Sequence, residues 1–448
     1  MPTSFYDVVV LGTHLEPLLC AALLGREGLR VLVLGQGSPD PGYTLSDVEV
    51  EPYGLSVTGI QSPVVQSTLE LLALRQDVRQ RMVDQDTPFQ FLRPQHRIEL
   101  RREADRWLAE LGRELPGVVH QATDVTRTLA EVGAELDMVA GRGLIWPPES
   151  FLERQRFSLV TSAQRYDRQG QGWTSWNQLA HGHPLRTAFE AALPFVSGLL
   201  PSQHSDATRA RLHGHLLGGV TELAGGWRWF RDALFGRVRS WGGDVRPRER
   251  VDSIQPGRGQ SHTITLARTG EQIGCSQIVH GTPIAELSQL LPGRAPMASV
   301  FERVGEPHPR AYRCSVHVLV DNEGVPEALG PLALLCPDES MPERAFWLRS
   351  RTIDEERVLF TASTLIDEHL IDTASSPLRF VRAEAMDALR SVVPFLDDHK
   401  IWIDSPHDGL APRAFDSDEE LPCSERWTRG PYTMRAIYEY PTRRALGV

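Results

Sequence analysis

The sequence predicts an α/β fold built around a parallel sheet, and two observations carry the prediction. The first forty residues show a βαβ pattern, with an apolar strand over Tyr6–Leu11, a helix over Leu15–Arg26 and a second strand over Arg30–Leu34. Gly274–His280 is a third short apolar strand, and a glycine turn follows it. Such strands suit a parallel sheet that is covered on both faces. We therefore expect all three to be neighbours in one Rossmann-like sheet, with the valines and leucine of residues 31–33 almost completely buried.

The turn after the first strand retains only part of a dinucleotide fingerprint. The pattern Gly-x-Gly-x-x-Gly gives a tight turn, close approach of the pyrophosphate and close helix–strand packing. The six positions here are Gly12, Thr13, His14, Leu15, Glu16 and Pro17. His14 therefore places a side chain where a pyrophosphate would lie. Glu16 adds a negative charge at the positive end of the helix dipole, which disfavours a phosphate.

The second strand also lacks the acidic residue that commonly binds the ribose hydroxyls. Leu34 is followed by Gly35 and Gln36, so no carboxylate is available at this point. A dinucleotide site in this chain would consist of six positions. These are Gly12, Thr13, His14, Leu15, Gly35 and Gln36. We expect the βαβ fold to form and its cofactor to bind weakly or not at all.

The overall composition indicates a globular chain with room for two or three domains. Among the 448 residues, 41% are hydrophobic and 23% are charged, and the net charge of −11 disfavours nucleic acid as the main partner. The five cysteines are odd in number and scattered, which indicates neither a disulfide framework nor a zinc site and fits a reducing cytoplasm. Neither a signal peptide nor an apolar run long enough to span a membrane is visible.

A second unit with strand and helix signals lies in the middle of the chain. Gly225-Gly226 begins a helix over Trp227–Trp241, and Gly242-Gly243 ends it. Asp244–Ile254 is predicted as one strand with His262–Arg268 as its hairpin partner. The helix Ile284–Leu291 is expected after the third apolar strand.

The remaining segments predict a substrate domain of helices and sheet. Ser62–Arg81 has the pattern of one helix, Phe89–Leu100 that of a hairpin, and Pro147–Ser205 that of a largely helical cap. Further helices are expected over Glu103–Leu115, His120–Val139 and Ser376–Phe395. One antiparallel sheet is expected from Tyr312–Val320, Leu332–Leu335, Ala345–Arg351 and Arg357–Ser363, with a last strand over Lys400–Asp404.

These pieces, in this order, resemble the flavin-dependent amine oxidase and phytoene desaturase superfamily, which also contains the Rab GDP-dissociation inhibitors. Four stretches carry the resemblance. They are Val8–Gly35, Ala224–Val245, Gln277–Leu291 and Phe89–Gly117. The resemblance implies a Rossmann-like FAD/NAD(P)-binding domain from residues 1–85 and 216–305. It also implies an inserted α+β substrate domain from residues 86–215 and 306–448.

The resemblance favours the first of two functions, and a third interpretation, a structural scaffold within a larger assembly, also stays open. One is an FAD-dependent oxidoreductase, similar to phytoene desaturases, that acts on an apolar substrate. The other is a non-catalytic scaffold, similar to the GDP-dissociation inhibitors, that binds an apolar ligand or a protein partner and can touch a membrane peripherally. The family's C-terminal flavin segment is not visible before Val448, which indicates either its loss or a shortened form. Three exchanges, His14→Gly, Pro17→Gly and Gly35→Glu, are expected to recover some FAD binding.

Other candidate sites have simpler structural explanations. His181-Gly182-His183 and His213-Gly214-His215 resemble metal ligands in spacing, but no carboxylate or cysteine lies nearby, so we predict no metal site. Trp173, Trp176, Trp227 and Trp229 are more typical of core packing than of a ligand site. No serine, cysteine or histidine constellation indicates a nucleophile, so the catalytic residues of an active enzyme stay unknown. In flavin chemistry the cofactor carries the reaction.

Overall fold

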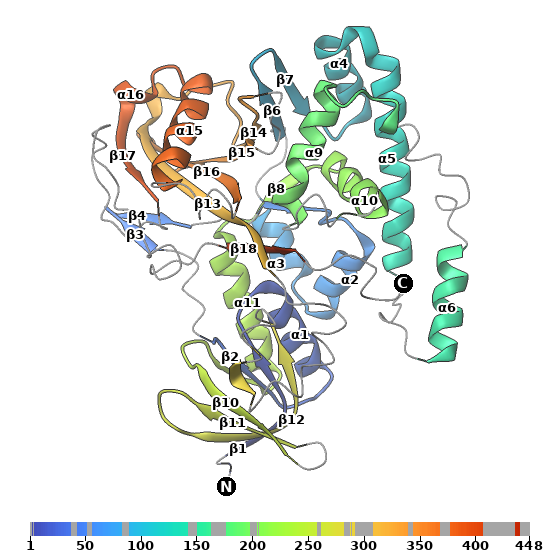
Figure 1. Ribbon diagram of the computed structural model, residues 1–448, viewed down its shortest axis with the longest axis vertical. Helices are drawn as coiled ribbons and strands as arrows, with labels where there is room; N and C mark the ends of the chain where they lie inside the picture. The colour runs from blue at the N-terminus through green and yellow to red at the C-terminus, as the bar shows by residue number, and fades with distance from the viewer. Residues whose placement is uncertain are drawn as a thin grey trace.

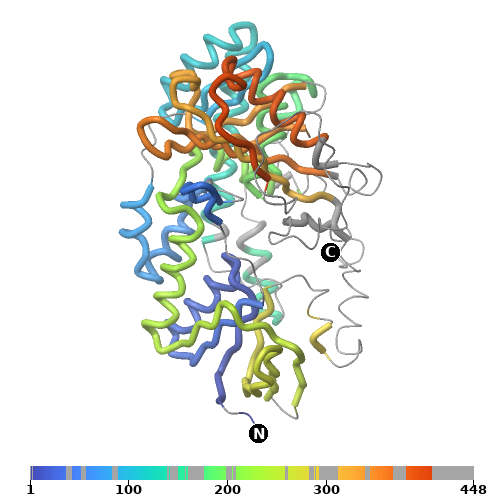
Figure 2. Tube along the Cα trace, turned by 90° about the vertical axis from the view of Figure 1, so that its left-hand side faces the viewer, coloured from blue at the N-terminus to red at the C-terminus, as the bar shows by residue number. Residues whose placement is uncertain are grey.

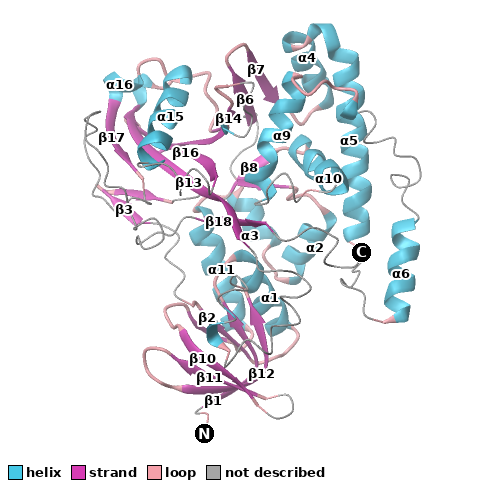
Figure 3. Cartoon of the chain, in the orientation of Figure 1, coloured by secondary structure: helices cyan, strands magenta, loops and turns pink. Residues whose placement is uncertain are grey.

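The computed structural model places two sheets at opposite ends of the molecule, with helices beside and between them (Figures 1 and 3). The structure describes residues 2, 4–36, 43–51, 56–82, 89–141, 150–162, 176–197, 204, 206–257, 261–281, 287, 289–291, 308–338, 344–367, 377–405 and 435–439.

The first sheet contains the three apolar strands that the sequence predicts. β1 (Ser4–Leu11) pairs in parallel with β2 (Val31–Leu34) on one side and with β12 (Gln272–His280) on the other. The full order is β10-β11-β12-β1-β2-β9. The prediction of neighbouring parallel strands is therefore confirmed. Residues 31–33 have no exposed surface, as expected for a central strand covered on both faces.

The stretch Asp244–Ile254 is two strands, and the prediction of one was wrong. β9 (Asp244–Arg246) pairs in parallel with β2, whereas β10 (Val251–Pro256) pairs with β11 (His262–Leu266) at the other edge of the sheet. Pro247 follows β9 directly and has no N–H to donate to a neighbouring strand, so the ladder ends there. The chain then crosses from one edge of the sheet to the other.

Two helices cover one face of this sheet. α1 (Leu15–Arg26) begins and ends as predicted, and α11 (Gly226–Ser240) packs beside it. Leu18 of α1, Leu234 and Val238 of α11 and the strand valines share one buried cluster. The predicted helix Trp227–Trp241 is thereby confirmed, with a buried face toward the sheet.

The predicted helix Ser62–Arg81 is broken into α2 (Pro63–Leu71) and α3 (Arg75–Arg81). Ala73 has a positive φ of 54°, which no helix accommodates. Leu72 and Leu74 on either side of it are almost fully buried. The sharp turn therefore lets two successive leucines enter the core, which a continuous helix would prevent.

The second sheet has the order β17-β13-β16-β15-β14-β6-β7, and β18 (Arg435–Glu439) also pairs with β13. Its strands are β6 (Phe89–Arg93), β7 (His96–Leu100), β13 (His308–Asp321), β14 (Leu332–Leu335), β15 (Phe346–Thr352), β16 (Arg357–Asp367) and β17 (Lys400–Asp404). The expected hairpin and strands are present. The sheet is mixed rather than purely antiparallel, because β14 pairs in parallel with β6.

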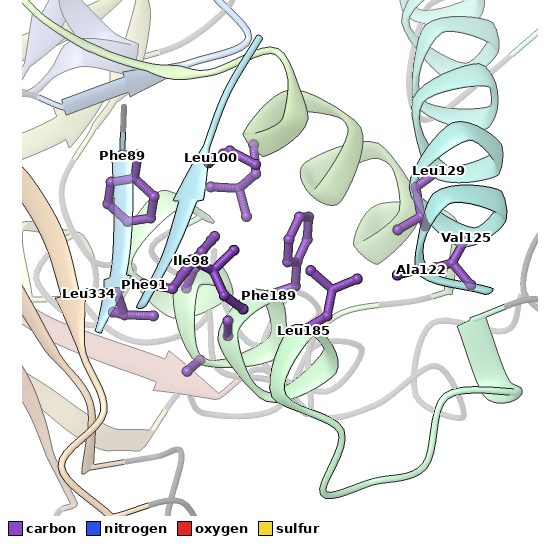
Figure 4. Packing of buried hydrophobic residues seen from close by; sticks show 14 of the residues in the cluster. Phe89, Phe91, Ile98, Leu100, Ala122, Val125, Leu129, Leu185, Phe189 and Leu334 are labelled. Carbon is purple, nitrogen blue, oxygen red and sulfur yellow. The ribbon is translucent and has the colours of Figure 1, made fainter. Parts of the chain in front are cut away.

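Helices cover this sheet from two sides (Figure 2). α15 (Pro377–Val392) and α16 (Leu396–His399) bury one face. The helical layer on the other side contains α4 (Ala104–Glu114), α5 (Val119–Ala140), α9 (Pro184–Ser197) and α10 (Asp206–Leu217). Its core lies against the β6–β7 hairpin, where Phe91 and Ile98 meet Phe189 (Figure 4). α6 (Phe151–Ser162) also belongs to the described part of the predicted cap.

A short hairpin links the two sheets. β3 (Tyr43–Leu45) and β4 (Val48–Val50) follow β2 in sequence, yet Val48 and Val50 are buried against Leu319, Leu359 and Trp402 of the second sheet. β5 (Ser56–Thr58) pairs with β8 (Val220–Glu222) between the sheets. The domain boundaries at residues 85, 215 and 305 stay a prediction.

Some predictions lie outside the described residues. These include most of the helix Ile284–Leu291, part of the predicted cap over Pro147–Ser205 and, within it, Trp173. Within the described residues, no helix is long and apolar enough to cross a membrane.

Candidate functional site

The candidate site lies where the carboxyl ends of β1, β2 and β12 meet, the usual ligand position in open α/β sheets. The Gly12 N–H donates to the Leu34 carbonyl oxygen at 2.8 Å, and the Gly281 N–H donates to the Leu11 carbonyl oxygen at 2.8 Å. These bonds bring the predicted turn at residues 12–15 next to Gly35.

The turn between β1 and α1 has the tight glycine conformation expected at its first position. Gly12 has φ of 103°, a conformation that favours glycine. Thr13 is buried, and the exposed His14 is the residue that precedes the first turn of α1. Glu16 lies exposed in that first turn. The helix N-terminus therefore already has a carboxylate close by.

The close helix–strand packing survives the loss of the third fingerprint glycine. Pro17 occupies that position and is buried. Its ring lies against Gly281, where an added Cβ would stand 2.5 Å from Pro17 Cβ. Close packing at this point is therefore permitted by a glycine in the segment after β12 rather than by one in the helix. Sequence inspection of the fingerprint alone could not find it, because the two residues are far apart in the chain.

The end of β2, where the sequence analysis expects a ribose, lies directly against the chain's own backbone. A Cβ on Gly35 would overlap the carbonyl oxygen of Pro247. The Gly35 N–H donates to the Arg246 carbonyl oxygen at 3.2 Å, and the Gln36 N–H donates to the Glu249 carbonyl oxygen at 3.0 Å. Residues 246–249 are thus held directly against the end of β2.

Gln36 completes this closure with its side chain. Its Oε1 accepts the Val251 N–H at 2.7 Å, and its backbone adopts a positive φ of 57°. The carboxamide oxygen that could have replaced the missing ribose acid is therefore already engaged within the protein. The expected exchange Gly35→Glu does not fit this geometry, because no side chain can leave position 35 without displacing Pro247.

A largely buried ion cluster joins β15 of the second sheet to β8 and to the start of α11, and sequence analysis missed it. Arg349 of β15 lies 2.6 Å from Glu222 of β8 through its Nε and 3.3 Å from Glu51 through its Nη1. Burial raises the pKa of the Glu222 carboxyl, and Arg349 opposes that shift. The Glu51 carboxylate also contacts Gly226, where a Cβ would overlap both of its oxygens.

Gly226 connects this cluster to the sequence pattern. Both Gly225 and Gly226 have positive φ, at 83° and 56°. The glycine pair therefore permits the sharp entry into α11 and leaves room for the carboxylate. A carboxylate at a helix N-terminus is stabilised by the unpaired N–H groups and the helix dipole. The Gly-Gly pair was the only sequence signal for this arrangement.

The histidine pairs have structural roles where the structure describes them. The His213 ring packs on Trp176 at 4.5 Å between centroids, tilted by 40°, and also packs against Phe189, and burial lowers its pKa to about 3. His215 Nε2 lies 2.8 Å from Asp137 on α5. Among the described residues, no group of three or more histidine, cysteine, aspartate or glutamate side chains is placed to hold a metal ion.

Comparison with solved structures identifies the fold. A putrescine oxidase bound to putrescine matches over 97% of this chain and 89% of its own, with a TM-score of 0.54 and 16% identity. The chain therefore shares with this oxidase its overall fold, a Rossmann-like α/β domain joined to a second domain of sheet and helices. An oxidoreductase from Methanosarcina mazei matches over 93% of this chain and 89% of its own, with a TM-score of 0.56 and 13% identity.

A Pyrococcus furiosus protein also matches, over 90% of this chain and 88% of its own, with a TM-score of 0.54 and 14% identity. No family model and no curated protein matches the sequence. The predicted fold class is therefore confirmed, and the resemblance to flavin-dependent amine oxidases is supported at the level of the fold. The roles of the residues at 12–15, 35 and 36 stay predictions.

Proposed function

We propose that this chain is a non-catalytic binding protein built on the flavin oxidoreductase fold. The observation that carries the proposal is the closed ribose end of the nucleotide site. The Pro247 backbone occupies the space into which a ribose-binding side chain at position 35 would extend. Gln36 Oε1 already accepts a hydrogen bond from the Val251 N–H. FAD would have to break these contacts to place its ribose at the carboxyl end of β2.

The energetic consequence is a large loss of affinity. Each hydrogen bond that a ribose would lose contributes about 0.5–1.5 kcal/mol net, and more when the acceptor is charged. His14 and Glu16 add a side chain and a like charge near the phosphates. Because about 1.4 kcal/mol corresponds to a tenfold change, several such losses reduce affinity by orders of magnitude. We therefore infer that FAD binds weakly or not at all.

The ligand class follows from the sequence resemblance rather than from the closed site. Phytoene desaturases and GDP-dissociation inhibitors both handle apolar molecules, so we propose an apolar ligand or a protein partner for this chain.

The second candidate function is an FAD-dependent oxidoreductase acting on an apolar substrate. The retained Gly12 turn favours it, because that turn places the N-terminus of α1 at the carboxyl edge of the sheet. In such an enzyme the flavin would supply the redox chemistry, and residues 12–15 would face its phosphates.

The visible spectrum of the purified protein separates the two functions. The protein is expressed in flavin-rich cells, and its absorbance near the flavin band is compared with that of a flavin oxidoreductase purified in parallel. We expect a colourless protein that does not quench the fluorescence of added FAD. A yellow protein with one flavin per chain would overturn the proposal and establish the oxidoreductase.

A further inference from the structure

Helices α3 and α11 carry an unusual concentration of positive charge. Together they contain seven arginines and two aspartates, whereas the whole chain has a net charge of −11. The arginines are Arg75, Arg79, Arg81, Arg228, Arg231, Arg237 and Arg239. A basic face on an acidic protein directs the molecule toward an anionic partner by long-range attraction.

The two helices form one continuous surface, which we call the α3–α11 face. The Ala224 N–H, just before α11, donates to the Arg81 carbonyl oxygen at 2.7 Å. At the other end, Arg237 Nη2 donates to the Ala73 carbonyl oxygen at 2.8 Å and lies 3.1 Å from Asp77. Val78 and Leu234 point inward into the shared core. Arg75, Arg79, Arg81 and Arg239 are exposed, whereas Arg228, Arg231 and Arg237 are half-buried.

Carboxylates neutralise only part of this face. Four arginines form ion pairs, namely Arg75 with Glu70, Arg228 with Glu49, Arg231 with Asp232 and Arg237 with Asp77. Arg79, Arg81 and Arg239 are exposed and form no ion pair with a carboxylate in the part of the chain that the structure describes. These three side chains supply the net positive charge.

Aromatic side chains orient two of these three guanidinium groups. Arg81 lies over the Trp229 ring at 5.3 Å from the centroid, and Arg239 lies over the Phe235 ring at 5.8 Å. Such cation–π contacts hold the planar group near the surface with its N–H donors free to meet phosphate oxygens.

The face also carries apolar groups of the kind that enter a membrane interface. Leu71 ends α2 next to the α3–α11 face, and 43% of its surface is exposed. Trp227 and Trp229 are half-buried on the first turn of α11. Tryptophan beside arginine is typical of the membrane–water boundary. There the apolar ring of tryptophan contacts lipid while its N–H contacts water. An acidic protein partner would pair with the arginines, but its binding would not require the exposed Leu71.

We propose that the α3–α11 face docks on an anionic phospholipid surface. Arginines near such a surface each contribute about 1 kcal/mol, and the apolar side chains enter the headgroup boundary. The proposal does not depend on whether the protein binds FAD. For either function, docking brings the protein to the lipid bilayer, in which apolar ligands dissolve.

Vesicle co-sedimentation tests the proposal. The full chain is mixed with vesicles of phosphatidylcholine alone or of phosphatidylcholine with added phosphatidylglycerol. We expect binding to the second kind only, and the binding should weaken with rising salt because the contact is ionic. No binding to anionic vesicles, or equal binding to both kinds, would overturn the proposal.

A matched pair of triple variants locates the surface. Arg79→Gln, Arg81→Gln and Arg239→Gln together should weaken the partition onto anionic vesicles by roughly 100-fold, because each arginine contributes about fivefold. The control exchanges Arg106, Arg127 and Arg390, which are exposed on other helices, for glutamine. It changes the net charge equally and should leave binding near that of the wild type.

The two variants separate an effect of this face from an effect of the total charge. An equal loss in both would mean that the total charge, and not this face, drives binding, and would contradict the proposal. Polyglutamate, a soluble acidic polypeptide, provides the last comparison. If it binds the face while anionic vesicles do not, the partner is an acidic protein and the membrane assignment is wrong.

Discussion

At the scale of single residues, the closure of the nucleotide site depends on the absence of a side chain at position 35. The backbone of Pro247 lies where a Cβ would be. We expect Gly35→Ala to lower the free energy of unfolding by about 1–3 kcal/mol, the usual effect of inserting an extra methyl group into packed structure. Urea unfolding measures the change.

Gly236 provides the control for this exchange. It lies in the interior of α11 with nothing within 4 Å of an added Cβ. Gly236→Ala should therefore stabilise the protein by about 0.5–1 kcal/mol. If the two exchanges have the same effect, the contact between Gly35 and Pro247 is not as close as described.

Val33 tests the burial of the central strand. Its side chain has no exposed surface. Val33→Asp should abolish folding, because an unpaired buried carboxylate destabilises by several kcal/mol, a large part of the 5–15 kcal/mol that stabilises a typical domain. Thr44→Asp, at an exposed position on β3, should express and melt normally. A Val33→Asp protein that stays soluble and melts cooperatively would contradict the assignment.

At the scale of elements, the helical layer should be sensitive to acid. Burial lowers the pKa of His213 to about 3 and that of His204 to about 4, against 6.5 for an unburied histidine. Below pH 6.5 the unfolded chain therefore binds protons that the folded chain does not. The free energy of unfolding should fall by about 1.4 kcal/mol per pH unit for each group, down to about pH 4.

The exchange His213→Leu isolates the contribution of His213 to this pH dependence, which is the larger of the two. It keeps an apolar side chain against Trp176 and Phe189 and removes one titrating group. Thermal melting followed by circular dichroism between pH 7 and about pH 4 should show a shallower pH dependence in this variant. An unchanged dependence would mean that His213 is already protonated in the folded protein.

Most helices and strands were predictable from the sequence, and the two that differ from the prediction do so for physical reasons. The helix Leu15–Arg26 and the strand Lys400–Asp404 matched the prediction because local periodicity and flanking turns define them. The predicted strand Asp244–Ile254 is divided at Pro247, and the predicted helix Ser62–Arg81 at Ala73. The helix break carries no glycine or proline. It arises because Leu72 and Leu74 both enter the core, which is a tertiary effect that a local pattern does not contain.

The candidate site was predictable only in part, for the same reason. The turn at Gly12 and the missing acid at Gly35 are visible in the sequence. The contacts of Gly35 with Pro247, of Pro17 with Gly281 and of Glu51 with Arg349 join residues more than 200 positions apart. No local pattern encodes such pairs, because they depend on how the strands and helices are arranged.

At the scale of the whole molecule, the ion cluster of Arg349 with Glu51 and Glu222 holds the second sheet against the start of α11. Arg349 contributes its charge from β15 of the second sheet, Glu222 belongs to β8, and Glu51 directly follows β4 and contacts Gly226 at the start of α11. Removal of one partner from a buried ion pair leaves an uncompensated charge and typically destabilises by about 3–5 kcal/mol. The cluster should therefore be a main determinant of the relative position of the two sheets.

The exchange Arg349→Met tests this role. We expect a loss of about 3–5 kcal/mol in urea unfolding, whereas Arg127→Met, which breaks the exposed pair with Asp124, should change stability by less than about 1 kcal/mol. Adding Glu51→Gln and Glu222→Gln to Arg349→Met should recover much of the loss, because neutral side chains no longer leave buried charges unpaired. A triple variant that is no more stable than Arg349→Met alone would show that packing, rather than charge, explains the effect of Arg349.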